Sequence, residues 1–223
     1  MIVPPEGLVL NIYKPQGLTS FGVVSRVRKK LNIKKVGHAG TLDPMAEGTL
    51  IVLVGKATKK ASEFSALDKE YRAGILLGEK TDTYDVTGKA LGSGDTSGVS
   101  LSRLQDALNE FSGEIEQVPP MFSALKVDGK RLYKLAREGV EIERKSRRIT
   151  IHQIKLERWE NPRLEITVRC SKGTYIRSLA HDLGEKLGCG GCLETLVRTA
   201  VGSYRVEDAM RLEEITLDAA ELD

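Results

Sequence analysis

The chain has 223 residues, 29% of them charged and 40% hydrophobic, a balance that excludes disordered and collagen-like proteins. Its longest apolar run, Thr49 to Val54, is far shorter than the ~20 residues of a membrane span, and no basic leader begins the chain. The net charge is +3, but residues 1–62 and 126–177 are basic whereas the stretches between and after them are acidic. We therefore expect a cytoplasmic protein without membrane contact, whose basic stretches favour an RNA or DNA partner.

The N-terminal third predicts a strand, a helix and a glycine-rich turn. Residues 8–14 read as a strand that ends before Gly17, and either Thr19 or Ser20 can cap the helix that follows. The apolar side chains of this helix recur at spacings of three and four residues: Phe21, Val24, Val27 and Leu31. The next expected elements, in chain order, are a turn over 37–48, a strand over 49–54, a helix over 59–67, a strand over 70–77 and a loop over 81–98.

The remainder predicts three longer helices, one short helix and an antiparallel strand pair. The helices span 101–111, 131–138 and 174–187, with Thr174 as the expected cap of the third, and a short helix begins near Leu212. Asp128-Gly129 is a hairpin signal. Strands over 148–159, with a slip near Gln153, and 164–168 pair across Asn161-Pro162.

No repeat or linker divides the chain, so we expect one domain over residues 1–223. Strands and helices are interspersed without regular β-α-β alternation. The fold class we expect is α+β, with a mixed, largely antiparallel sheet flanked by helices.

Two motifs suggest chemistry that the sequence does not complete. Gly48 to Lys56 has the wrong glycine spacing for a phosphate loop, and Ala57 stands where a magnesium-binding hydroxyl is needed. Cys189 and Cys192 have the spacing of a redox or zinc site, but no second pair exists to complete it. Reduced structural thiols are the favoured interpretation, and a zinc-binding protein remains the alternative.

The most informative segment is residues 37–48, where three glycines and Pro44 constrain the backbone around one carboxylate, Asp43. His38 lies in the same segment, between two of the glycines. Taken alone, an Asp before proline is most often a turn former. The residues around it decide between a turn and a catalytic loop.

This segment, Gly37-His38-Ala-Gly-Thr41-Leu42-Asp43-Pro44, resembles the catalytic motif of the TruB family of tRNA pseudouridine synthases. Further blocks similar to the family's follow in its order: Lys14-Pro15-x-Gly17-x-Thr19-Ser20, Lys69-Glu70-Tyr71, Thr81-Asp82-Thr83 with Asp85 and Gly88, Pro119-Pro120-Met-Phe-Ser123-Ala124-Leu125-Lys126, Gly129 with Arg131-Leu-Tyr133, and Gly173-Thr-Tyr175-Ile-Arg177-Ser-Leu179. Together they cover nearly the whole chain.

The resemblance implies the pseudouridine synthase fold, with an active-site cleft across its sheet, and an isomerase that converts uridine to pseudouridine at position 55 of the tRNA T loop. Such enzymes break the glycosidic bond, turn the uracil in the pocket and rejoin its C5 to the sugar. They use no metal and no other cofactor. The expected partner is the T stem-loop of tRNA, with no obligatory protein partner and a monomeric enzyme.

The resemblance also implies roles for individual residues. Asp43 is the expected nucleophile, Arg177 its ion-pair partner, and Tyr71 the ring that stacks on the flipped uracil and can move protons. Substrate-binding roles are expected for His38, which stacks into the vacated base position, and for Tyr175, Lys14, Asp82 and Leu179. Lys14 is expected to hold phosphate, whereas Asp82 has an unspecified role near the substrate and reads equally well as a solvated turn residue.

One departure from the family concerns length, because the chain ends without the PUA domain that most bacterial members carry after the catalytic part. Two alternatives therefore stay open. The protein could be an RNA-binding or RNA-folding factor for T-loop-like structures, or a pseudouridine synthase that acts on another RNA.

Overall fold

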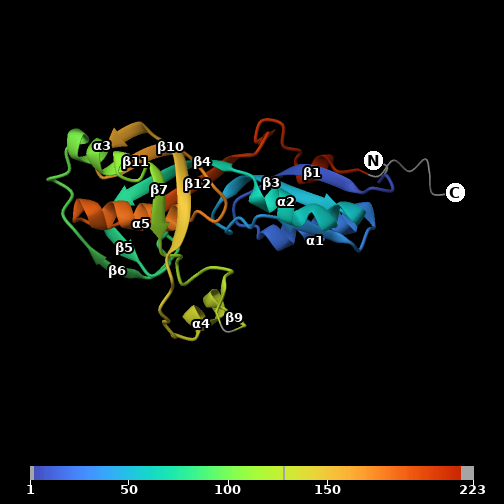
Figure 1. Ribbon diagram of the computed structural model, residues 1–223, viewed down its shortest axis with the longest axis horizontal. Helices are drawn as coiled ribbons and strands as arrows, with labels where there is room; N and C mark the ends of the chain where they lie inside the picture. The colour runs from blue at the N-terminus through green and yellow to red at the C-terminus, as the bar shows by residue number, and fades with distance from the viewer. Residues whose placement is uncertain (1–2, 128, 217–223) are drawn as a thin grey trace. The chain divides into compact units, whose positions relative to one another are not determined.

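The structure is a computed structural model that describes residues 3–127 and 129–216, and the chain divides into two compact units (Figure 1). The first unit comprises Met1–Arg72 with Leu196–Asp223, and the second unit comprises Ala73–Thr195. Strands β4 (Lys69–Leu77) and β12 (Gly191–Val201) each contribute residues to both units. The expectation of a single catalytic domain stays a prediction.

The first unit is a small mixed sheet with helical segments. Strand β3 (Glu47–Val54) pairs antiparallel with β1 (Leu8–Lys14) and β2 (Val36–Ala39). Strand β12 pairs parallel with β3 and antiparallel with β13 (Tyr204–Arg205). The helical segments are α1 (Ser20–Leu31), η1 (Gly55–Lys60), α2 (Ala61–Ala66) and η2 (Leu212–Glu214).

Helical segments cover both faces of β3, which explains its continuous apolar sequence. Leu50, Val52 and Val54 pack in one cluster with the buried side of α1. Ile51 and Leu53 point to the opposite face, where they pack with residues of η1 and α2. A strand that is buried on both faces reads as an unbroken apolar run rather than an alternating one.

Helix α1 begins as predicted, but one of its expected core residues is wrong. Thr19 is the N-cap, and its hydroxyl oxygen accepts a hydrogen bond from the Gly22 N–H. Val23 is buried, whereas Phe21 is 61% exposed and lies beneath the Arg28 guanidinium at 5.5 Å. Both Phe21 and Val23 fit a spacing of three or four residues to later apolar positions, so periodicity alone wrongly placed Phe21 on the buried side of the helix.

The second unit is largely antiparallel. Its sheet has the strand order β4-β11-β10-β7, and β10 (Arg147–Glu160) pairs antiparallel with both β11 (Arg163–Cys170) and β7 (Gly113–Gln117). A register shift lies between Ile151 and Gln153, which confirms the predicted slip. The other elements are β5 (Glu79–Thr81), β6 (Ala90–Ser93), α3 (Leu101–Asn109), β8 (Lys126–Val127), β9 (Lys130–Arg131), α4 (Leu132–Arg137) and α5 (Ile176–Leu187).

Several expectations on local structure need correction. The sequence did not predict β2, β6, β7 or β12, and β5 and β6 pair where a loop was expected. The helix expected over 59–67 is a 3-10 turn followed by α2, and the segment at Leu212 is also 3-10. Thr174 is not the cap of α5: Tyr175 is, while the Thr174 hydroxyl donates to the Ser171 carbonyl. Asp128 lies outside the described residues.

These elements confirm the expected α+β class with a mixed, mostly antiparallel sheet flanked by helices. Most of the short strands pair with the next strand in the chain, as β5 does with β6, β8 with β9 and β2 with β3, so cross-strand pairing overrode local turn chemistry there. None of the helices in the described ranges is long and apolar enough to cross a membrane.

Candidate active site

The Asp43 loop, defined as residues 40–46, connects β2 to β3 in the first unit. Asp43 is half-buried near the middle of this loop. Its carbonyl accepts a hydrogen bond from the Ala46 N–H at 3.1 Å, which closes a tight turn behind the side chain. The loop therefore presents one carboxylate from a short, turned segment between two paired strands.

Residues at the start of α1 fix one side of the Asp43 loop. The buried Ser20 hydroxyl donates to the Leu42 carbonyl at 3.0 Å and accepts from the Leu42 N–H at 2.8 Å. The Gly17 N–H donates to the Pro44 carbonyl at 2.7 Å. Both neighbours of Asp43 are thus hydrogen-bonded to residues at or just before the start of α1, which limits the positions that the carboxylate can take.

We expect Ser20→Ala to lower the free energy of unfolding by about 2 kcal/mol, because it leaves two buried backbone groups of Leu42 unpaired. Chemical denaturation of both proteins measures this loss. Ser62→Ala, at an exposed position of α2, is the control and should change the midpoint little. Equal stability of Ser20→Ala and wild type would show that Leu42 finds other partners.

Lys14 is fully buried beside the same loop. Its ammonium donates to the carbonyls of Leu18 at 2.6 Å, Pro15 at 3.0 Å and Pro44 at 3.5 Å. Burial lowers the pKa of Lys14 from 10.5 to about 8, although the Asp43 carboxylate opposes this shift. Because the Lys14 side chain has no exposed surface, the predicted phosphate contact would require a rearrangement and stays a prediction. In this structure the side chain holds the loop and lies within electrostatic reach of Asp43.

The pKa of Lys14 makes stability depend on pH in a defined window. The unfolded chain keeps the Lys14 proton up to about pH 10.5, whereas the folded chain releases it at about 8. Because the unfolded state binds more protons between these values, stability should rise with pH there, by up to about 1.4 kcal/mol per pH unit. Denaturation of wild type and Lys14→Met from pH 7.5 to 10.5 measures the difference, and parallel curves would contradict it.

Two further predicted residues lie in the first unit. His38 belongs to β2 and is half-buried, and burial, followed by the Arg198 charge, lowers the pKa of its imidazole. A neutral imidazole suits stacking against bases. Tyr71 lies in β4 and is 8% exposed. Asp43, His38, Tyr71 and Lys14 thus belong to one unit of the fold.

Arg177 lies in the second unit, in the first turn of α5, and is 5% exposed. Its Nε lies 3.7 Å from Oδ2 of Asp85, whose side chain is equally buried. Its other nitrogens donate to the carbonyls of Thr83 at 2.9 Å and Phe122 at 2.8 Å. Arg177 is therefore held in place by a carboxylate that the sequence analysis did not assign; its predicted pairing with Asp43 stays a prediction.

Asp85 organises the loop that holds Arg177. Its Oδ1 accepts hydrogen bonds from the Thr83 hydroxyl and from both the N–H and the hydroxyl of Thr87. Tyr84, between Thr83 and Asp85, has a left-handed backbone (φ 64°) and stacks on His181 with centroids 3.9 Å apart. Asp82, the carboxylate that the sequence analysis named, accepts from the Lys89 N–H as a turn residue does.

Tyr175 and Leu179 also come from the start of α5. The Gln117 side chain holds the backbone of Tyr175, since its amide nitrogen donates to the Tyr175 carbonyl and its oxygen accepts from the Tyr175 N–H. Leu179 has no exposed surface, so a contact with RNA would require a rearrangement there. Tyr175 is half-buried.

A cavity of about 640 Å³ in the second unit lies around α4 and β9. Its lining includes Lys130, Arg131, Lys134 and Tyr133, against one carboxylate, Glu138. Three cations beside an aromatic ring favour an anionic ligand such as a phosphate backbone. This hollow belongs to the basic stretch that the sequence analysis noted.

The three cysteines are free and buried, as the favoured interpretation expected. Burial raises the pKa of Cys192 to about 11, so its thiol stays protonated at neutral pH. Within residues 3–127 and 129–216, the His, Cys, Asp and Glu side chains form no group of three that could hold a metal ion.

Sequence reasoning gave no role to two residues that the structure brings to these loops, Asp85 and Arg198. Asp85 stood within a quoted block, and the two threonines around it were a signal for a carboxylate that accepts local hydrogen bonds. Arg198 lies in β12, which was not predicted. The sequence signal was the alternation of Leu196, Arg198 and Ala200, which places the arginine on the same strand face as two apolar residues.

Comparison with known proteins agrees with these features. Residues 28–176 match the model of the TruB family pseudouridylate synthase N-terminal domain, and residues 177–222 match the tRNA pseudouridylate synthase B C-terminal domain. The chain belongs to the TruB family of pseudouridylate synthases.

Curated relatives named tRNA pseudouridine synthase B cover most of the chain. The protein of Clostridium tetani is 49% identical over 93% of this chain and 72% of its own length. That of Opitutus terrae is 46% identical over 96% of this chain and 90% of its own.

Solved structures share the pseudouridine synthase fold. A Cbf5-Nop10-Gar1 complex contains a chain with TM-score 0.72 and 32% identity, over 95% of this chain. An H/ACA RNP bound to a substrate RNA containing 2′-deoxyuridine gives TM-score 0.68 and 28% identity, also over 95%. This chain spans 56% of each of those chains.

Proposed function

We propose that this protein isomerises a uridine of tRNA to pseudouridine, at position 55 of the T loop, with Asp43 as the nucleophile. The observation that carries the proposal is the Asp43 loop of a chain of this family, in which the residues on both sides of a half-buried Asp43, Leu42 and Pro44, are hydrogen-bonded in place. A fixed carboxylate is what an attack at one sugar carbon requires.

The reaction moves one bond and one proton. Asp43 forms a bond to C1′ as the N1–C1′ bond of uridine breaks. After the uracil turns, a C5–C1′ bond forms as the Asp43–C1′ bond breaks, and C5 then loses its proton while N1 gains one. Uracil must first leave the loop, at a cost of a few kcal/mol, and aromatic rings favour the extruded base by stacking. Tyr71 is the proposed stacking ring and His38 the residue that fills the vacated position.

The remaining roles rest on the resemblance. Arg177 is the proposed cation for Asp43 and Tyr175 a proposed wall of the pocket, whereas the substrate roles of Leu179 and Asp82 remain predictions. The name of the relatives, which specifies tRNA, supports the T stem-loop as substrate. The cationic hollow at α4 supports an RNA contact, and we propose a cytoplasmic monomer that needs no cofactor.

The test is incubation of a synthetic T stem-loop RNA with the purified protein, without added metal or nucleotide, followed by nucleoside analysis. We expect one pseudouridine per RNA, and none when the target uridine is replaced by cytidine. Tight RNA binding without conversion of the stem-loop or of whole tRNA would favour the RNA-folding interpretation. If the protein converts only a different RNA, the proposed substrate is wrong and the proposed reaction still holds.

A further inference from the structure

Arg198 is a charged side chain in the interior of the first unit, with only 1% of its surface exposed. The residues two positions away on either side in β12, Leu196 and Ala200, are buried apolar residues. A guanidinium is rarely buried without hydrogen bonds, because leaving water is unfavourable for the charge. Its presence among these side chains requires specific acceptors.

All the acceptors that the structure gives Arg198 are backbone carbonyls around the Asp43 loop. Its Nε donates to Thr49 in β3 at 2.7 Å. Its Nη2 donates to Gly40 at 3.1 Å and its Nη1 to Thr41 at 3.4 Å. The planar guanidinium thus links a buried strand to the first two residues of the loop, with a geometry that other side chains do not reproduce.

The backbone of Arg198 is fixed as closely as its side chain. Residue 198 pairs with Gly48 in the parallel register of β12 and β3. A Cβ on Gly48 would lie 2.3 Å from the Arg198 carbonyl oxygen, and Gly48 has φ +103°, so only glycine permits this approach. The guanidinium therefore starts from a defined point on β12, next to the strand that follows the loop.

We propose that Arg198 is a positioning residue, which holds the carbonyls of Gly40 and Thr41 so that Asp43 is presented in one conformation. This inference rests on the proposed role of Asp43 as nucleophile. Ser20 fixes Leu42, and Arg198 fixes the two residues before it, so the chain leading to Asp43 is anchored from α1 and from β12. A displacement of about 1 Å at a reacting group can cost about 10²-fold in rate.

The position of Arg198 also separates its effect on turnover from an effect on binding. Because the side chain is buried, it makes no direct contact with RNA, and its removal should leave KM nearly unchanged. Loss of positioning should appear in kcat instead. A merely structural role would lower stability and leave kcat intact in the molecules that remain folded.

The experiment compares Arg198→Met and Arg198→Lys with wild type, well below the unfolding temperature of every variant. We expect Arg198→Met to lower kcat on the T stem-loop by about 10²-fold with KM within about threefold. Arg198→Lys keeps the charge but loses the planar fork, so it should recover only a small part of kcat. Amide exchange at Leu42 and Ala46 should accelerate by about tenfold or more in both variants.

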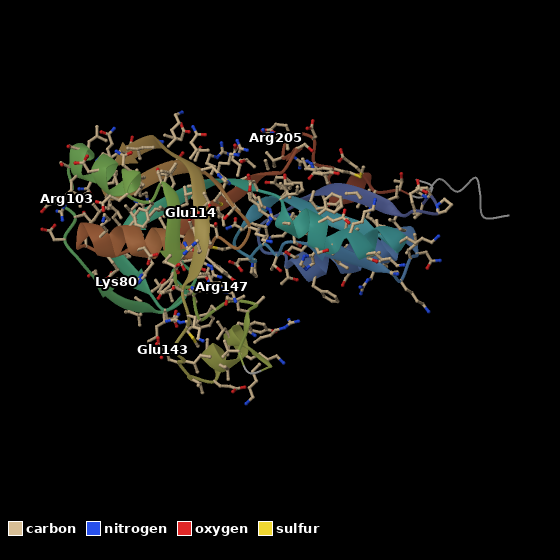
Figure 2. All side chains as sticks on the ribbon, in the orientation of Figure 1. Lys80, Arg103, Glu114, Glu143, Arg147 and Arg205 are labelled. Carbon is tan, nitrogen blue, oxygen red and sulfur yellow. The ribbon has the colours of Figure 1, made fainter. Side chains whose placement is uncertain are left out.

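Two control variants belong to the same unit. Leu31→Ala removes a buried side chain at the far end of α1. It should lower the stability of the protein without changing kcat or amide exchange at Leu42 and Ala46. Arg205→Lys makes the same substitution, arginine to lysine, at a 52% exposed arginine of β13, which is labelled in Figure 2. It should match wild type in every readout.

Three results would overturn the inference. These are wild-type kcat in Arg198→Lys, an equal loss of kcat in Leu31→Ala, and unchanged exchange at Leu42 and Ala46. If Arg198→Met does not fold, Arg198→Lys carries the same test with an expected loss of about tenfold or more. If the wild-type protein converts no RNA, the proposed function fails, whereas amide exchange still decides whether Arg198 holds the loop.

Discussion

Asp43→Asn is expected to reduce the rate of pseudouridine formation by about 10⁴-fold, with RNA affinity and stability close to wild type. The substitution keeps the shape of the side chain and removes the negative charge with which the carboxylate attacks. The loop should survive, because the loop hydrogen bonds described around residues 42–46 use Ser20, Pro44 and backbone groups. Single-turnover assays with a labelled T stem-loop measure the loss, and RNA binding is measured in parallel.

The control is Asp106→Asn, at an exposed position of α3, which should turn over like wild type. Full turnover by Asp43→Asn would contradict the assignment of the nucleophile. Loss of RNA binding together with turnover would indicate that the substitution disturbs the loop rather than the chemical step.

Asp85→Ala is expected to lower the free energy of unfolding of the second unit by about 3–5 kcal/mol, the usual cost of removing one partner from a buried ion pair. Arg177 would lose a carboxylate 3.7 Å away, and three donors from Thr83 and Thr87 would lose their acceptor. Turnover should fall as well, because the loop that holds Arg177 loses its order. Denaturation followed by fluorescence or circular dichroism measures the stability loss.

Asp95→Ala is the matched control, since Asp95 also accepts hydrogen bonds from a nearby residue, Ser97, but is exposed and carries no buried arginine. It should destabilise much less. Asp85→Asn keeps an acceptor oxygen without the charge, so its stability should lie between those of Asp85→Ala and Asp95→Ala. It provides a folded variant if Asp85→Ala does not fold. Equal stability of Asp85→Ala and Asp95→Ala would contradict the importance of the ion pair.

The elements that the sequence predicted well are those whose local signals agree. Strand β1, helix α1 with its Thr19 cap, and the β10–β11 pair with its slip at Gln153 all follow from turn residues and periodicity within one segment. Among the missed strands, β2, β6 and β7 are short, whereas β12 is long but pairs with β3, which is far away in sequence. Strands β7 and β12 form because distant strands, β10 and β3, pair with them, and a single sequence carries no record of those partners. Strands β2 and β6 pair with neighbouring strands but are too short to show an alternating pattern.

The site shows the same division. The resemblance to the family assigned roles to Asp43, His38, Tyr71 and Arg177, and these roles stay predictions. It did not find that Lys14 points inward, because a lysine at the end of a strand before a proline gives no sign of three carbonyl acceptors. Arg198 was missed because its backbone acceptors lie far away in sequence. Asp85 had a local signal in Thr83 and Thr87, but its ion-pair partner Arg177 is distant in sequence.

The most direct test of the central claim maps pseudouridine along an unmodified tRNA transcript, by chemical modification and primer extension, after incubation with wild type or Asp43→Asn. We predict one converted uridine, at position 55 in the T loop, with wild-type protein and none with Asp43→Asn. Conversion at another position, or equal conversion by both proteins, would contradict this account of the substrate and of the nucleophile respectively.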